Sequence, residues 1–307
     1  MSAVLDEPEA PMDSVPEPQT QLPDATVLED KTPEWFRSRP VTVLLTILLG
    51  CWFVVLAARP LWHSDLWDHV DYGDLLLQQK AMFHSEPLLP LAQGVPMVNI
   101  PWLTQVGMSA LIDRFGLSSI QFVFSSCITL SLALVVWRAS TRARSGIAGL
   151  IALAICLLVG HVQLIVVRPQ VVAVILNSIV LVWAFSRHRF RRIAWVGLPL
   201  LFAFWANCHG SFAVGLITIG ISVAGRATDV YLRSRSPRLA IRDPQFIRGL
   251  LLLQLCAAAV LINPFGLAVY PEVFTVAGNP NVETMYEWEP LTLRDEQGQY
   301  ALMGLLL

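Results

Sequence analysis

The residues best suited to chemistry lie in the stretch SDLWDHVDYGD, which begins at Ser64 and follows a long apolar run. Asp65, Asp68 and His69 fall at i, i+3 and i+4, so a helix that begins at Ser64 presents them on one face. A carboxylate there can act as general base for a bound hydroxyl, and a neighbouring carboxylate or imidazole can orient it. We predict Asp65 as the base, with Asp68 or His69 as its partner. The alternative is an amphipathic helix that lies at a membrane surface without catalytic function.

Further polar residues interrupt the apolar sequence and are candidates for binding a substrate. Arg168, which Pro169 follows, is suited to a bidentate contact with a phosphate because its guanidinium is planar. Its alternative role is snorkelling to the interface or pairing with a carboxylate. The other candidates are Asn207 and His209 in ANCHGS, Asn263 in INPFG, and Glu287 in EWEP. Each of these has a structural alternative as a helix cap, a turn residue or a solvated loop residue.

Sequence motifs for metals and common cofactors do not occur in the chain. The five cysteines are scattered singly, without a CxxC pattern or a Cys/His pair at metal spacing. Neither a disulfide framework nor a zinc site is therefore predicted. GxGxxG, Walker, GxSxG and HExxH patterns do not occur either. The cofactor stays unknown, and a divalent cation stays open. We expect membrane lipid as a partner and no nucleic acid.

The elements that must position these residues are membrane helices. The chain has 307 residues and is 55% hydrophobic and 14% charged, whereas soluble domains carry about 25% charge. Apolar segments close to the length of a bilayer span occupy 41–58, 117–137, 147–167 and 170–185. Shorter or interrupted apolar runs occupy 190–207, 211–225 and 246–262, and an eighth begins near Tyr300. The sequence thus predicts an all-α polytopic transmembrane helical bundle with about seven to eight spans.

The basic residues predict how this bundle is oriented. Lys and Arg concentrate in alternate loops if 41–58 is the first span and 117–137 the second, and such loops face the cytoplasm. Residues 59–116 then form one long external loop that contains amphipathic helices, with 100–116 lying along or dipping into the membrane surface. The N-terminus is predicted to be cytoplasmic, and all the polar clusters face outward.

The first part of the chain differs from the rest in composition. Residues 1–30 contain eight acidic residues, five prolines and no Lys or Arg, a composition that cannot bury a core. We predict a disordered, acidic, Pro-rich cytoplasmic tail at 1–39 and a transmembrane domain at 40–307. The chain ends inside its eighth apolar run, with ALMGLLL, and we expect a truncated product or a fragment.

The order of the motifs resembles a largely uncharacterised family of bacterial polytopic membrane proteins. SDLWDHVDYG, WLTQ, RPQ, WANCHGSFAVGL, NPFG and EWEP follow one another over roughly residues 61–290. That family is similar to the GT-C class of membrane glycosyltransferases, which take sugars from polyprenyl-phosphate carriers on the outer side of the membrane. The resemblance implies a GT-C-like fold, a location in the bacterial cytoplasmic (inner) membrane and a polyprenyl-phosphate sugar donor.

The resemblance also assigns positions to the site. It puts the acidic residue of the first external loop at Asp65, and the later motifs contain Arg168, Asn207, His209, Asn263 and Glu287. The chain departs from the family at His63, where a second acidic residue is common, and at Glu86-Pro87-Leu88, where Asp-Pro-Phe is expected. These departures argue against an Asp-x-Asp metal site. The alternative is a non-enzymatic membrane scaffold, or a subunit that binds envelope lipid or glycan; a transporter is a third hypothesis.

Overall fold

The structure is a computed structural model that describes residues 39–61, 64–160, 164–186, 190–278 and 292–306. Within these ranges every regular element is a helix, and the β structure is limited to one isolated bridge between Ser85 and Pro96. The predicted all-α class is confirmed for this part of the chain. Apart from Arg39, the predicted acidic tail lies outside the described residues.

The helices coincide closely with the apolar segments of the sequence. Their bounds are α1 Pro40–Ala57, α2 Ser64–Gln79, α3 Trp102–Phe115, α4 Ser118–Ala143, α5 Gly146–Gly160, α6 Gln170–Ala184, α7 Arg192–Trp205, α8 Phe212–Ser234, α9 Pro237–Arg242, α10 Pro244–Val260, the 3₁₀ turn η3 Gly266–Ala268, α11 Val269–Ala277 and α12 Glu296–Leu306. Each of the eight predicted apolar runs contains or overlaps one helix. Local apolar content and helix length therefore located these elements correctly.

Within the described part of the chain, three helices are long and apolar enough to cross a membrane, namely α1, α4 and α8. Four shorter apolar helices, α5, α6, α7 and α10, have 14 to 17 residues. At 1.5 Å per residue these fall below the roughly 20 residues that span a bilayer of average thickness. The helices support a membrane protein, and the larger number of spans stays a prediction.

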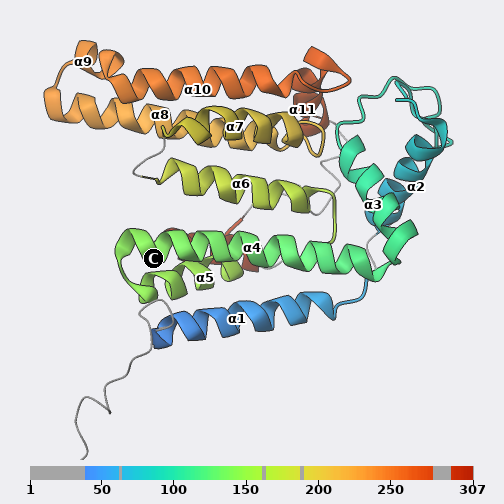
Figure 1. Ribbon diagram of the computed structural model, residues 1–307, viewed down its shortest axis with the longest axis horizontal. Coiled ribbons are helices and arrows are strands. Elements are labelled where there is room, and N and C mark those ends of the chain that lie inside the picture. Colours follow the sequence, from blue (N-terminus) through green and yellow to red (C-terminus); the bar gives the residue numbers. More distant parts are fainter. Residues whose placement is uncertain (1–38, 62–63, 161–163, 187–189, 279–291, 307) are drawn as a thin grey trace, which may run out of the picture. The chain divides into compact units, whose positions relative to one another are not determined.

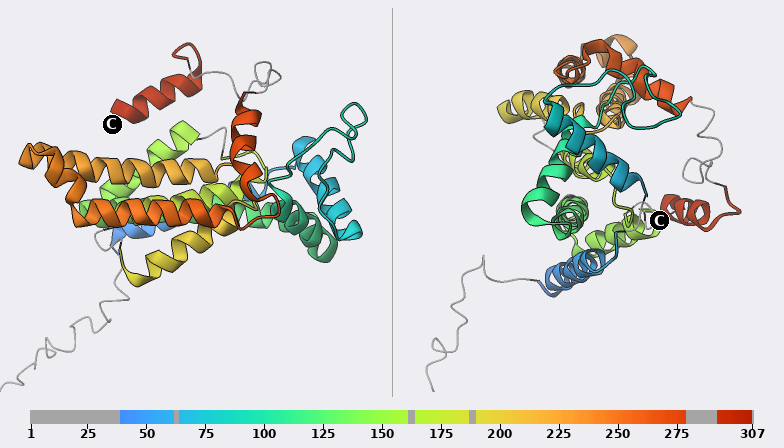
Figure 2. Two further views of the ribbon diagram at one scale, coloured as in Figure 1. Left: turned by 90° about the horizontal axis from the view of Figure 1, so that it is seen from above. Right: turned by 90° about the vertical axis from the view of Figure 1, so that its right-hand side faces the viewer.

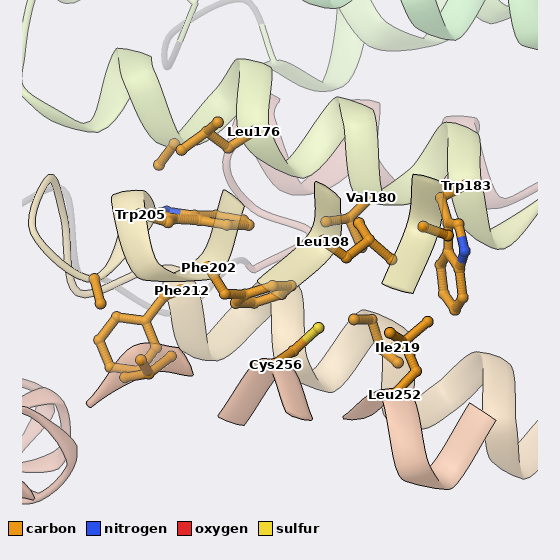
Figure 3. Packing of buried hydrophobic residues seen from close by; sticks show 14 of the residues in the cluster. Leu176, Val180, Trp183, Leu198, Phe202, Trp205, Phe212, Ile219, Leu252 and Cys256 are labelled. Carbon is orange, nitrogen blue, oxygen red and sulfur yellow. The ribbon is translucent and has the colours of Figure 1, made fainter. Parts of the chain in front are cut away.

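The long helices pack side by side as a bundle (Figure 1). Helix α4 packs against α1, α5 and α6, and α10 packs against α7 and α8. The contact between α6 and α8 joins these two groups. Large side chains of α6, α7, α8 and α10 fill the space between them, among them Val180, Phe202, Phe212 and Leu252 (Figure 3). Close packing of this kind holds helices together in lipid, where there is little water to exclude.

Gly215 lets α8 approach α7 at the level of two aromatic rings. A Cβ at this position would lie 2.5 Å from Cζ3 of Trp205 and 3.0 Å from Cε1 of Phe202. Both rings are fully buried, so neither has free space into which it can move. A larger side chain at this position would therefore force α8 away from the end of α7.

Helices α2 and α3 form a pair at one end of the bundle, where α3 also packs against α4 (Figures 1 and 2). Helix α2 begins at Ser64, as predicted, and α3 lies within the predicted surface segment 100–116. Leu66, Val70 and Leu76 of α2 are buried, whereas Leu77 is exposed. A step of 3.6 residues per turn allows either leucine on the buried face, and the contact with α3 decides between them.

Candidate functional site

The predicted site residues that the structure describes come from segments that meet at the same end of the bundle. Helices α2 and α3 lie there, together with the start of α6, the turn between α7 and α8, and the end of α10 (Figure 1). Backbone and side-chain hydrogen bonds join these segments, and they fix the positions of the side chains described below.

Asp65 and Arg168 form an ion pair between α2 and the start of α6. Nη2 of Arg168 lies 3.0 Å from Oδ2 of Asp65. The Arg168 side chain is 14% exposed and that of Asp65 is 46% exposed, so the carboxylate reaches solvent while the guanidinium lies deeper. Pro169 is the N-cap of α6, so Arg168 is the residue that immediately precedes the cap. The structure therefore brings together the predicted base and the predicted phosphate ligand.

His69 is held by a chain of two buried amides. Nε2 of Gln105 donates to Nδ1 of His69 over 3.1 Å, and Nδ2 of Asn99 donates to Oε1 of Gln105 over 2.7 Å. Gln105 and Asn99 are each 1% exposed. Since Nδ1 accepts this hydrogen bond, the neutral imidazole carries its proton on Nε2. Burial lowers the pKa of His69, Arg168 lowers it further, and Asp65 and Asp68 oppose the effect.

His209 lies in the turn between α7 and α8. Its Nδ1 accepts a hydrogen bond from the backbone N–H of Ser211 at 3.1 Å and lies 2.9 Å from Oγ of that serine. Burial lowers the pKa of His209 to about 4, and the charge of nearby His69 acts in the same direction. Both imidazoles are thus neutral at pH 7, and each has its Nδ1 engaged within the protein.

The low pKa of His209 predicts that acid destabilises the folded protein. The pKa falls from an ordinary value of 6.5 to about 4 in the folded state, so below pH 6.5 the unfolded chain binds a proton that the folded chain does not. We expect the free energy of unfolding to decrease by about 1–3 kcal/mol between pH 7 and pH 4 on this account. Thermal unfolding in detergent over this pH range measures the decrease. His209→Gln should make the profile flatter; an equally steep profile would contradict the assignment.

Asn207 ties three segments together. Its Nδ2 donates to the backbone carbonyls of Ala203 at 2.7 Å and Ile262 at 2.8 Å, and its Oδ1 accepts from Nε1 of Trp102 at 2.8 Å. Its backbone carbonyl also accepts from the N–H of Leu103. These bonds join α3 to the ends of α7 and α10. The residue orients the site, and its predicted contact with a substrate stays a prediction.

The remaining predicted residues have different positions. Asn263 closes a turn, with Nδ2 donating to the carbonyl of Val260 at 2.6 Å and Oδ1 accepting from the N–H of Phe265 at 2.7 Å. Asp68 is exposed on α2. Glu287 lies outside the described residues. Substrate binding by Asn263 and by Glu287 stays a prediction, as does a catalytic role for Asp68.

A buried carboxylate in the loop after α2 was not identified from the sequence as part of this region. Oε2 of Glu86 accepts from the hydroxyl of Tyr72 at 2.6 Å, and Oε1 accepts from the N–H groups of Leu88 and Leu89. Burial alone would raise the pKa of Glu86, but these hydrogen bonds outweigh it and lower the pKa. The carboxylate is therefore ionised and anchors the loop that leads to Asn99.

Gln105 and Asn99 are the other residues that sequence reasoning missed. The motif WLTQ contains Gln105, but a single glutamine in a mostly apolar segment has no spacing that marks it as a partner of His69. The available signal was its polarity, because a polar side chain on a packed helix requires a hydrogen-bond partner. The identity of that partner depends on how α3 packs against α2.

An apolar groove of about 310 Å³ lies beside the ion pair, between α3, α4, α6 and α7. Arg168 lines one part of it. Most of the other lining side chains are apolar, among them Leu103, Met108, Phe124, Val171 and Phe204. A groove of this volume is within the range of small-molecule sites. It is suited to an apolar chain whose anionic end meets the guanidinium.

The described residues contain no group of three or more His, Cys, Asp and Glu side chains that could hold a metal ion.

Comparison with known proteins yields no further guide to the chemistry, because no protein-family model, curated protein or solved structure matches the chain. The assignment of a function therefore rests on the geometry of the site.

Proposed function

We propose that this chain is an integral membrane protein that takes a sugar from a polyprenyl-phosphate carrier and transfers it to a hydroxyl acceptor, as GT-C glycosyltransferases do. The observation that carries the proposal is Arg168, which lines the apolar groove and lies 3.0 Å from the carboxylate of Asp65. The groove is suited to hold an isoprenoid chain, and the guanidinium is suited to bind a phosphate. The carboxylate is suited to accept a proton from the acceptor hydroxyl.

The proposal places the site on the external face of a bacterial inner membrane, with the N-terminus in the cytoplasm and about seven to eight spans. Its support is the distribution of basic residues along the helices. At the end of the bundle away from the site, the helix termini and short connections are rich in arginine, with Arg142, Arg144, Arg192, Arg233 and Arg238 as examples. Loops with an excess of Lys and Arg usually face the cytoplasm.

Asp65 and Arg168 have separate roles in the proposed reaction. Asp65 removes the proton from the acceptor hydroxyl, and the acceptor oxygen then forms a bond to the anomeric carbon. The bond from that carbon to the phosphate oxygen breaks, and its electron pair stays on the departing lipid phosphate. Arg168 stabilises the charge that develops on this phosphate. The neutral His209 can assist only as a hydrogen-bond donor through Nε2, because its Nδ1 is engaged with Ser211.

His69 has an orienting role in this proposal. Gln105 fixes its ring from the Nδ1 side, which leaves the Nε2–H free of that bond to donate toward a carboxylate or an acceptor oxygen. Because its pKa is lowered, the imidazole stays neutral and does not compete with Arg168 for the phosphate. Asp65 remains the group that accepts the proton.

A specific observation also favours the second candidate, a non-enzymatic scaffold or a subunit that binds envelope lipid or glycan. Asp65 and Arg168 already satisfy each other, and they connect α2 to α6. An ion pair of this kind can serve as a structural tie without chemistry. The groove would then hold a lipid without acting on it.

Binding of farnesyl phosphate to the purified protein in detergent tests the proposal. Arg168→Ala should weaken binding about tenfold or more, as expected for loss of a charge-assisted contact. Asp65→Asn should bind at least as well as the parent, because it removes a negative charge beside the phosphate. Arg114→Ala is the matched control, since Arg114 is exposed at the same end of the bundle.

Two outcomes would reject the proposal. The first is a folded parent protein that binds farnesyl phosphate no better than farnesol, which lacks the phosphate. The second is equal binding by Arg168→Ala and Arg114→Ala. In either case the scaffold becomes the better description.

A further inference from the structure

A second pocket, at the opposite end of the bundle, combines two arginines with an apolar wall. It has a volume of about 250 Å³ and lies between the last turns of α4 and of α6. Arg138 and Arg142 contribute from α4. The rest of the lining is Val135, Ala139, Leu181, Val182 and Phe185. The proposed transfer reaction does not involve any of these residues.

The guanidinium of Arg138 is the least satisfied polar group of this pocket. Its Nε and Nη2 are buried, and neither has a hydrogen-bond partner among the described residues. A buried donor without an acceptor is costly, and a buried charge is more costly still. Because these nitrogens are closed to solvent, an anion in the pocket would remove this cost by accepting from both once the guanidinium turns toward it.

The spacing of the two arginines suits a single anionic group. Residues four apart on a helix lie on the same face, about 5–6 Å apart at Cβ. Guanidinium groups bind phosphate through paired, nearly parallel hydrogen bonds. Arg142 is exposed, so it can contact the oxygens of a phosphate that face solvent. Arg138 can contact the oxygens that face the protein.

The neighbouring side chains indicate that this anion belongs to a lipid. Phe185 is 61% exposed and Trp137, next to Arg138, is 55% exposed. An exposed tryptophan near the end of a membrane helix is typical of the headgroup level of a bilayer. The apolar wall offers a surface to an acyl chain, whereas a soluble anion gains nothing from it.

We propose that Arg138 and Arg142 bind the phosphate of an anionic phospholipid, with its acyl chain against Leu181, Val182 and Phe185. Basic pockets between membrane helices are a known way to hold such headgroups. The inference needs the helices to lie in a membrane, but it does not need the proposed glycosyltransferase activity. A lipid bound here would tie the ends of α4 and α6 together.

Native mass spectrometry of the full chain tests this site. The protein is exchanged into detergent containing equal amounts of phosphatidylglycerol and phosphatidylcholine with the same acyl chains, and the retained lipids are counted. The parent should retain phosphatidylglycerol in preference. Arg138→Gln should weaken this retention about tenfold or more, since two charge-assisted hydrogen bonds are lost. Arg142→Gln should have a smaller effect because Arg142 is exposed.

Arg144→Gln is the matched control. Arg144 is the C-cap of α4, so it lies close to the pocket and carries the same charge, but it does not line the pocket. It should retain as much phosphatidylglycerol as the parent. If Arg138→Gln fails to fold, as judged by its melting temperature, the comparison of Arg142→Gln with Arg144→Gln decides the question.

Three results would overturn the inference. One is equal retention of phosphatidylglycerol by the pocket variants and by the Arg144→Gln control. Another is a parent that retains phosphatidylcholine equally well. The third is full displacement of the lipid by millimolar inorganic phosphate, which would show a site for a soluble anion.

Discussion

Asp65→Asn should abolish sugar transfer while the protein remains folded and still binds a prenyl phosphate. Loss of a general base usually costs about 10²–10⁴-fold in rate. The amide has nearly the shape of the carboxylate but cannot accept the acceptor's proton. Formation of the product from a prenyl-phosphate sugar in proteoliposomes measures the effect, with farnesyl phosphate binding followed in parallel.

The stability of this variant should change little. The Asp65 side chain is 46% exposed, and the asparagine oxygen can still accept a hydrogen bond from the more deeply placed guanidinium of Arg168, so we expect a loss of only about 1 kcal/mol. A large decrease in the melting temperature of Asp65→Asn would therefore indicate that the ion pair has a structural role. Transfer at the parent rate by a folded Asp65→Asn protein would exclude Asp65 as the base.

An exchange of the two charges separates chemistry from structure. In the Asp65→Arg/Arg168→Asp double variant the ion pair can re-form, but the guanidinium no longer lines the apolar groove. If the pair acts only as a structural tie, the exchange should restore whatever the single substitutions lose. If the proposed function is correct, prenyl-phosphate binding and sugar transfer should both stay lost.

Gly73→Val should have the largest effect on folding, because it forces α2 away from α3. A Cβ at position 73 would lie 2.2 Å from the backbone oxygen of Gln105 and 3.0 Å from Cβ of Ser109. A backbone oxygen within a helix cannot move aside alone, so the two helices must separate. We expect a loss of about 3 kcal/mol or more in the free energy of unfolding, at the upper end of the usual cost of overpacking.

Separation of these helices should also disrupt the site. The same segment of α3 carries Gln105, which holds His69. Thermal unfolding and farnesyl phosphate binding should both be impaired in Gly73→Val. Gly107→Ala on α3 is the control for stability alone, because a Cβ at position 107 has no neighbour within 4 Å but the residue lines the apolar groove. Equal stability of the two variants would show that α2 and α3 are not in close contact.

Local signals in the sequence were sufficient to locate most helices. Runs of apolar residues located the long helices to within about two residues at most ends. The exceptions are three C-terminal ends: α5 ends earlier than predicted, at Gly160, and α4 and α8 extend beyond their predicted runs, to Ala143 and Ser234. The start of α2 at Ser64 followed from the serine and the acidic residue after it. These features depend on residues within one or two helical turns of each other, so the sequence displays them directly.

The pairing of polar side chains could not be read in the same way. Asp65 and Arg168 were named as members of one site, but their contact depends on how α2 and α6 meet. Asn207 was predicted to contact a substrate, and the structure shows a side chain whose bonds hold α3 to α7 and α10. A polar residue between apolar runs has the same local pattern in both roles.

The sequence by itself determined an all-helical, strongly apolar chain with its polar residues gathered in a few short segments. Only the tertiary structure decided that Gln105 and Asn99 hold His69, and that the apolar groove meets Arg168. The physical reason is the range of the interactions. Helix formation depends on neighbours three and four residues apart, whereas a hydrogen bond between two helices, or a groove among four of them, depends on packing between distant segments.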